Sequence, residues 1–128
     1  MAKTALYLIL GFLSFPALAQ APRGELACKP TGTDFVYDCT LRLTRGGKPL
    51  EGVQVTVGAD MPAMPMAHNV QPQKARPGTR PGEYLLRLDL EMLGEWAVKL
   101  RLRGPVRDQV ILHYEFDDKG ATAVRRRR

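Results

Sequence analysis

Apolar residues recur at every second position along most of this chain, and this alternation constrains its fold more than any other feature. From Phe35 to Thr44 the odd positions carry Phe, Tyr, Cys and Leu, while the even positions are mostly polar. The same period of two recurs in residues 53–57, 84–90, 96–102 and 110–116. Such a period is typical of a half-buried β-strand, because successive side chains point to opposite faces. A shorter first strand is expected around Leu26 and Cys28.

Turn-forming residues separate these segments, and no segment sustains a helical period. Glycine and proline punctuate the chain in short clusters, at residues 29–32, 45–48, 77–82, 93–94 and 104–105. Short alternating strands with this spacing predict an all-β fold, an antiparallel immunoglobulin-like β-sandwich of about seven strands.

The N-terminal residues have the composition of a secretory signal peptide. Lys3 precedes an apolar run over residues 5–16, and Ala17-Leu18-Ala19 is a small-residue cleavage site. We expect residues 1–19 to be removed, which leaves 128 − 19 = 109 residues beginning at Gln20. A retained membrane anchor is the alternative. No second such run follows, so we expect a periplasmic or secreted protein with no membrane span in the mature chain.

The mature chain is expected to form one domain over residues 20–118, followed by a basic tail over residues 119–128. Without Lys3 the net charge is 18 − 13 = +5, and Arg125 to Arg128 contribute four of these charges. The remaining domain is nearly neutral, which argues against a nucleic-acid partner. The tail is expected to be solvated; contact with anionic lipid or an acidic partner is the alternative.

Cys28 and Cys39 are the only cysteines, and both fall on the inward positions of their strands. An even cysteine count in an exported chain predicts a disulfide bond. A metal site made of two thiolates is the alternative.

Residues 59–76 fit neither strand nor helix, and they contain an unusual concentration of sulfur. The stretch ADMPAMPMAHN holds Met61, Met64, Met66 and His68. Pro62 and Pro65 favour an extended backbone, on which two or three of the sulfurs and the imidazole can converge.

Thioethers and imidazole together suit copper, and specifically Cu(I). Thioethers are neutral, soft ligands that bind reduced copper and hold hard cations poorly. Unlike thiols, they do not form disulfides in an oxidising compartment. The sequence therefore predicts a Cu(I) site formed by Met61, Met64, Met66 and His68. The alternative is that these methionines fill an irregular gap at one end of the sandwich.

Other candidate residues point to structure rather than chemistry. Trp96 is in phase with the inward residues of its strand and is expected in the core, Met92 is expected to pack at a turn, and His113 is expected on the surface. The chain has no serine after residue 19 and none of the common nucleotide or metalloprotease motifs. We therefore expect no enzymatic activity.

The chain resembles the YtkA-like/FixH-like family of exported domains. The resemblance covers roughly residues 48–116 and is carried by MPAMPMAHNV, by Pro81-Gly82-Glu83-Tyr84 and by Met92-Leu93-Gly94-Glu95-Trp96. It implies an immunoglobulin-like sandwich and an association with copper handling or with the assembly of copper-containing respiratory oxidases. It also implies that Met61, Met64, Met66 and His68 are the ligands.

The expected function is that of a monomeric periplasmic copper chaperone or buffer, whose partner is another periplasmic or membrane copper protein. The alternative is a metal-free accessory domain that docks on a membrane complex, such as a respiratory oxidase assembly or an efflux system. A copper sensor is a third interpretation that the sequence does not separate from the first.

Overall fold

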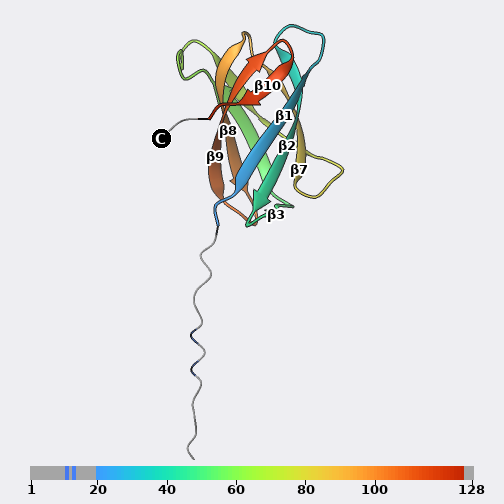
Figure 1. Cartoon of the computed structure of the whole chain (residues 1–128), viewed down its shortest axis with the longest axis vertical. Coiled ribbons are helices and arrows are strands. Elements are labelled where there is room, and N and C mark those ends of the chain that lie inside the picture. Colours follow the sequence, from blue (N-terminus) through green and yellow to red (C-terminus); the bar gives the residue numbers. More distant parts are fainter. Residues whose placement is uncertain (1–10, 12, 14–19, 126–128) are drawn as a thin grey trace, which may run out of the picture.

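Ten β-strands and no helix make up the described part of the chain, which comprises residues 11, 13 and 20–125 of a computed structural model (Figure 1). The strands are β1 (Arg23–Pro30), β2 (Val36–Arg45), β3 (Lys48–Pro49), β4 (Gln54–Asp60), β5 (Asn69–Lys74), β6 (Arg76–Pro77), β7 (Glu83–Asp89), β8 (Gly94–Arg103), β9 (Asp108–Asp117) and β10 (Gly120–Ala123). The expected signal peptide lies outside the described residues, apart from Gly11 and Leu13. Within the described residues, no helix is long and apolar enough to cross a membrane.

The strands form two antiparallel sheets that pack face to face. The first has the order β1-β2-β7-β6, with β3 also paired to β2, and the second has the order β10-β9-β8-β4-β5. This arrangement matches the two sheets of the immunoglobulin fold, with β4, β8 and β9 in the places of strands C, F and G. The predicted all-β antiparallel sandwich is confirmed. Besides the expected strands, it contains the very short β3, β6 and β10. It also contains β5, which corrects the expectation that residues 59–76 form no strand, because Asn69–Lys74 pair with β4.

The core lies between the sheets and is built from the alternating residues of the long strands. In β2 the odd residues Tyr37, Cys39, Leu41 and Leu43 are all buried, as predicted. Trp96 of β8 is 0% exposed, so its expected place in the core is confirmed. Burial of these side chains is the main driving force for the fold.

Tyrosine hydroxyls connect the two sheets. The buried Leu26 N–H of β1 donates to the Tyr114 hydroxyl of β9 across 2.9 Å. The Tyr37 hydroxyl donates to the Asp117 carbonyl. Burial, and then the nearby charge of Asp117, raise the pKa of Tyr37 above its ordinary value. The hydroxyl therefore stays protonated and keeps its role as a donor.

Cys28 and Cys39 form the predicted disulfide bond. They are direct partners in the β1–β2 register, with Cα atoms 4.1 Å apart. Cys39 is buried and Cys28 is partly exposed. The bond therefore joins neighbouring strands of one sheet, whereas the disulfide of antibody domains crosses between the sheets.

The domain continues beyond residue 118, which corrects the expected tail over residues 119–128. β10 pairs with the end of β9, in the register Gly120↔Asp117 to Ala123↔Tyr114. An added Cβ on Gly120 would lie 2.6 Å from the Cys28 carbonyl oxygen, so only glycine fits this close approach to β1. Arg125 is exposed, and residues 126–128 lie outside the described residues.

Candidate metal-binding loop

Four connections meet at one end of the sandwich, which we call the apical end. They are residues 31–35, 61–68, 90–93 and 118–119, and each joins strands that run to or from this end. In Figure 1 this end lies at the top, where residues 61–68 form the yellow-green loop at the upper left. All four sequence-predicted metal ligands lie in that loop, which we call the Met–His loop.

The Met–His loop is a pair of turns closed at its base. The Met61 N–H donates to the His68 carbonyl across 3.2 Å. Within the loop the Met64 N–H donates to the Met61 carbonyl, and the Ala67 N–H donates to the Met64 carbonyl. Pro62 and Pro65 each occupy the second position of one of these turns, where the fixed proline φ is favoured. The expected extended backbone is therefore wrong, because the prolines initiate turns.

The three methionines of the loop have very different exposures. Met61 is 5% exposed and belongs to the core, whereas Met64 is 38% and Met66 is 94% exposed. Met61 continues the inward positions of β4, since Val55, Val57 and Ala59 are buried before it. Met61 therefore packs as the gap-filling alternative expects, whereas the predicted site counted it among the ligands. Met64 and Met66 remain the accessible sulfur donors.

His68 is held at the base of the loop by a carboxylate. Its Nδ1 lies 3.2 Å from Glu91 Oε2, and its side chain is 28% exposed. Because a carboxylate accepts hydrogen bonds, this contact puts a hydrogen on Nδ1, and the neutral form of the ring then has its lone pair on Nε2. Histidine ligands of metals commonly show this arrangement, in which a carboxylate fixes the tautomer and ring orientation. Sequence reasoning missed Glu91, since 23 residues separate it from His68.

The backbone at the apical end is held in unusual conformations. Glu91 has φ 35° and Phe35 has φ 62°, both in the left-handed region that non-glycine residues rarely adopt. The Leu90 N–H donates to the Phe35 carbonyl across 2.9 Å, and the Met92 N–H donates to the Leu90 carbonyl. Such strained residues persist only where the surrounding contacts hold them. The side chain of Glu91 extends from this strained backbone to His68, where its Oε2 lies 3.2 Å from Nδ1.

Core residues pack against the Met–His loop and against residues 90–93. An added Cβ on Gly94 would lie 3.0 Å from the Met61 methyl carbon, so the methionine packs where a larger residue would intrude. The Trp96 indole N–H donates to the Met92 carbonyl across 3.2 Å. Met92 packs against the core, as expected. Trp96 is fully buried, so it acts as an anchor for residues 90–93.

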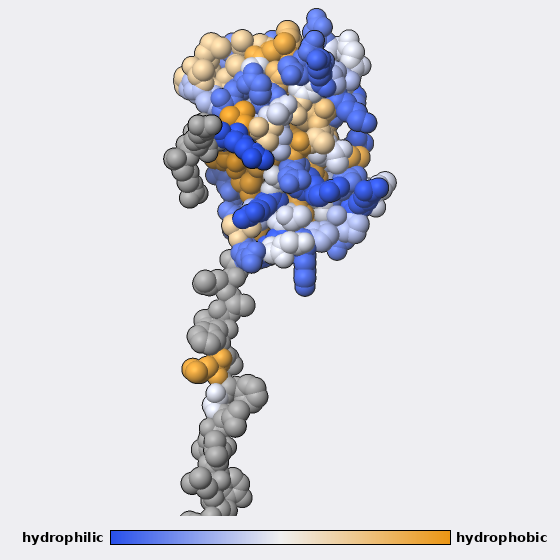
Figure 2. Space-filling model, viewed as in Figure 1, coloured by the Kyte–Doolittle hydropathy of each residue, from blue (hydrophilic) through white to orange (hydrophobic). Residues whose placement is uncertain are grey.

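The surface of the apical end carries several exposed apolar side chains. Figure 2 shows apolar surface at the upper left of the molecule, next to hydrophilic surface at the upper right. The large exposed apolar side chains of the apical end are Phe35, Met64, Met66 and Leu93. Among the described residues, no group of three or more His, Cys, Asp or Glu side chains could hold a metal ion. A metal held at the Met–His loop therefore depends on thioethers.

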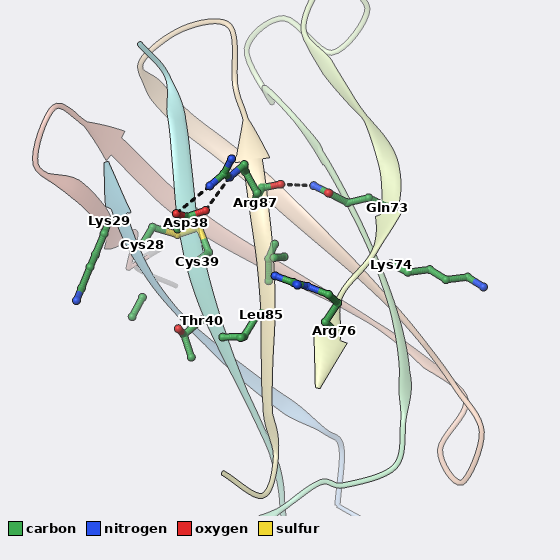
Figure 3. Close-up of a pocket in the computed structure, with 12 residues that line it drawn as sticks. Cys28, Lys29, Asp38, Cys39, Thr40, Gln73, Lys74, Arg76, Leu85 and Arg87 are labelled. Atoms are coloured by element: carbon green, nitrogen blue, oxygen red, sulfur yellow. Dashed lines mark hydrogen bonds and ion pairs between the residues drawn. A yellow bond between two sulfur atoms is a disulfide. The ribbon is translucent and has the colours of Figure 1, made fainter. Parts of the chain in front are cut away.

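A hollow with a volume of about 590 Å³ lies on the outer face of the first sheet (Figure 3). Thr40 and Leu85 lie on the sheet within it, while Lys29 and Lys74 extend away from it. Asp38 and Arg87 form a two-pronged ion pair with N–O distances of 2.8 and 3.2 Å. Hydrogen bonding to Arg87 lowers the pKa of Asp38 below its ordinary value. The carboxylate of this hollow is thus paired with Arg87, and Lys29 and Lys74 are directed away from it.

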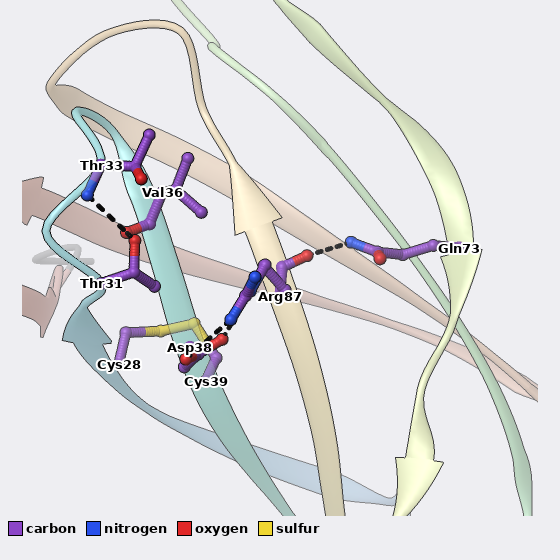
Figure 4. A network of polar contacts seen from close by, with 8 residues as sticks. All are labelled: Cys28, Thr31, Thr33, Val36, Asp38, Cys39, Gln73 and Arg87. Carbon is purple, nitrogen blue, oxygen red and sulfur yellow. Dashed lines mark hydrogen bonds and ion pairs between the residues drawn. A yellow bond between two sulfur atoms is a disulfide. The ribbon is translucent and has the colours of Figure 1, made fainter.

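Local hydrogen bonds stiffen the connection that links β1 to β2 above this hollow (Figure 4). The Thr31 hydroxyl donates to the Val36 carbonyl and accepts from the Thr33 N–H.

A further hydrogen bond links the two sheets. The Gln73 side-chain amide of β5 donates to the Arg87 carbonyl of β7. These contacts are structural and bring no chemically reactive groups together.

His113 lies on the outer face of the second sheet, away from the core. Its Nδ1 is 3.5 Å from Glu95 Oε1, and its side chain is 25% exposed. It therefore lies on the surface, as expected, but is half-buried beside a carboxylate.

The fold and the loop define a class: a disulfide-linked β-sandwich of immunoglobulin topology that presents methionine and histidine on one apical loop. The family model for YtkA-like domains matches residues 29–101. The chain therefore belongs to the YtkA-like family. Comparison with curated proteins finds no match, and comparison with solved structures finds none either.

Proposed function

We propose that this YtkA-like domain binds one copper ion as Cu(I) at the Met–His loop, and that it serves as a periplasmic copper chaperone or buffer. The observation that carries the proposal is the contact between His68 and Glu91. It leaves Nε2 as a lone-pair donor on the same loop that exposes the thioethers of Met64 and Met66.

The chemistry of this donor set favours Cu(I) over other ions. Two thioethers and one imidazole are soft to borderline donors, and none of them needs to lose a proton in order to bind once Nε2 is free. Met61 takes a different role, because its side chain packs in the core and would have to leave it to reach an ion. We therefore assign the first coordination sphere to Met64, Met66 and His68.

The position of the loop suits transfer of the ion. The donors lie on an exposed turn at one end of a rigid sandwich, so a partner can approach them without any strand separating. Copper can then move by stepwise ligand exchange, because each thioether can be replaced individually.

Replacing both exposed thioethers tests this assignment. The variant Met64→Leu/Met66→Leu keeps the apolar volume and should weaken Cu(I) binding at least tenfold, about 1.4 kcal/mol. Affinity is measured by competition with a chromogenic Cu(I) chelator. Met61→Leu is the matched control, since it removes a thioether of the same loop that is buried; its affinity should stay close to that of the unmodified protein. Equal affinity for Cu(I) in the double variant and the unmodified protein would refute the proposal.

A metal-free accessory domain is the second candidate function. Phe35 and Leu93, which are 37% and 41% exposed, favour it because they are apolar and bind no metal. In this case the apical end would dock on a membrane complex, such as a respiratory oxidase assembly. Native mass spectrometry of protein from copper-supplemented cells separates the two functions. A stoichiometric copper adduct supports the chaperone, whereas a co-purifying complex without copper supports the accessory domain.

A further inference from the structure

Positive charge gathers at the end of the sandwich opposite the Met–His loop. We call this the basal end; it comprises the connections 46–47, 50–53, 78–82 and 104–107 with the strand ends that flank them and the start of β1. Its cations are Arg23, Arg45, Lys48, Arg80, Arg103 and Arg107, and its carboxylates are Glu51, Glu83 and Asp108. The net charge of the basal end is therefore 6 − 3 = +3.

The apical end carries the opposite charge. Counted in the same way, its loops and strand ends hold one cation, Lys119, and six carboxylates: Asp34, Asp60, Asp89, Glu91, Asp117 and Asp118. The net charge is 1 − 6 = −5. The near-neutral domain is thus strongly polarised along its length.

Five of the six basal cations are available for binding; the sixth, Arg45, is half-buried and donates its Nε–H to the Gln20 carbonyl. Every ion pair found among the described residues involves other side chains: His68–Glu91, Arg87–Asp38, Lys99–Asp60 and His113–Glu95. Arg23, Lys48, Arg80, Arg103 and Arg107 are all exposed.

Arginines also line two shallow hollows at this end. Arg42 and Arg80 line one of about 300 Å³, together with Thr44, Pro49 and Pro81. Arg101, Arg103 and Arg107 line another of about 370 Å³, in which Asp108 is the one carboxylate. The Asp108 carboxylate already accepts a hydrogen bond from the Gln109 N–H. Guanidinium groups match the geometry of phosphate oxygens, so both hollows fit a phosphate-bearing headgroup.

We infer that the basal end docks the domain on a membrane surface rich in anionic phospholipid. The cations come from several separate loops and spread across one whole end, as contact with a broad anionic surface requires. β1 starts at this end, so a retained anchor over residues 5–16, the alternative to a cleaved signal peptide, would join the domain on the same side. Docking in this orientation points the acidic apical end and the Met–His loop away from the lipid.

Vesicle binding by residues 20–128 tests the inference. This chain contains every core side chain of the sandwich, from Leu26 to Phe116, so it retains the fold. We expect co-sedimentation with phosphatidylethanolamine vesicles that contain phosphatidylglycerol, little with phosphatidylcholine vesicles, and a decline as salt is raised. Arg80→Gln/Arg103→Gln/Arg107→Gln should lower the partition coefficient about a hundredfold, from roughly fivefold for each cation removed.

The matched control removes the same charge from another face. Lys29→Gln/Lys74→Gln/Arg76→Gln alters exposed cations at the hollow of the first sheet, and it should keep most of the vesicle binding. All variants retain Arg125 to Arg128, and circular dichroism confirms their fold. An equal loss in both triple variants would overturn the basal orientation. No binding to phosphatidylglycerol, or tighter binding to soluble poly-glutamate than to the vesicles, would overturn membrane docking itself. The proposed copper site is unaffected by either result, because it lies at the apical end.

Discussion

Glu91 is the residue on which the proposed copper site depends most, although its carboxylate does not have to bind the metal. It accepts a hydrogen bond from His68 Nδ1 and thereby selects the tautomer whose Nε2 can bind copper. Its own position is fixed by a backbone in the left-handed region and by the indole of Trp96, which holds the next residue. Glu91 is thus a positioning residue, tied to the core through a short chain of contacts.

Removing the charge of Glu91 should weaken copper binding without unfolding the domain. Partners of this kind contribute about 10- to 100-fold to metal affinity, and we expect Glu91→Gln to lose about tenfold. Asp89→Asn is the control, because Asp89 is an exposed carboxylate at the same end. Cu(I) competition gives the affinities, and the chemical shifts of the His68 ring report the tautomer. If the two variants bind alike, Glu91 does not orient the ligand.

At the scale of elements, the period of two predicted the long strands and most of the core correctly. If the period of two is continued one residue beyond the end of β4, it also predicts that Met61 is buried in the core, in phase with Val57 and Ala59. β10 was missed because Gly120 and two alanines carry little apolar signal. The turns of the Met–His loop were missed because proline suits both an extended chain and the second position of a turn. Which turn forms depends on backbone hydrogen bonds that a pattern of side chains does not show.

The disulfide between β1 and β2 belongs to this scale, because it secures an edge strand that pairs with β2 alone along its length. Closing the short segment between Cys28 and Cys39 is worth about 3 kcal/mol in the chain-entropy description. The variant Cys28→Ala/Cys39→Ala should lose stability of this order in urea unfolding, with hydrogen exchange rising first in β1. Its Cu(I) affinity should match that of the unmodified protein. A large loss of affinity would instead place the cysteines in the metal site.

At the scale of the whole molecule, stability, metal donors and positive charge lie in different parts of the sandwich. The core and the disulfide provide a rigid body, the apical end carries the accessible sulfur donors with negative charge around them, and the basal end carries the cations. A rigid body with unlike ends suits a task in which one end is held and the other exchanges cargo. The three proposed ligands nevertheless lie within five consecutive residues, Met64 to His68. The unfolded chain therefore also contains all three ligands close together. The contribution of the fold is the difference in Cu(I) affinity between the folded and the unfolded chain.

That difference can be measured as a stability change on copper binding. The fold closes the loop through the backbone hydrogen bond from the Met61 N–H to the His68 carbonyl. It also supplies Glu91, which a short peptide lacks. We expect a peptide of residues 59–70 to bind Cu(I) about tenfold more weakly than the domain, because it must order the loop as it binds. Saturating Cu(I) should then stabilise the domain by about 1.4 kcal/mol, the free-energy equivalent of that ratio. Urea unfolding at a buffered Cu(I) concentration measures this stabilisation independently of the ratio of affinities. Equal affinities, with no shift of the unfolding midpoint, would mean that the sandwich only displays the loop and does not preorganise it.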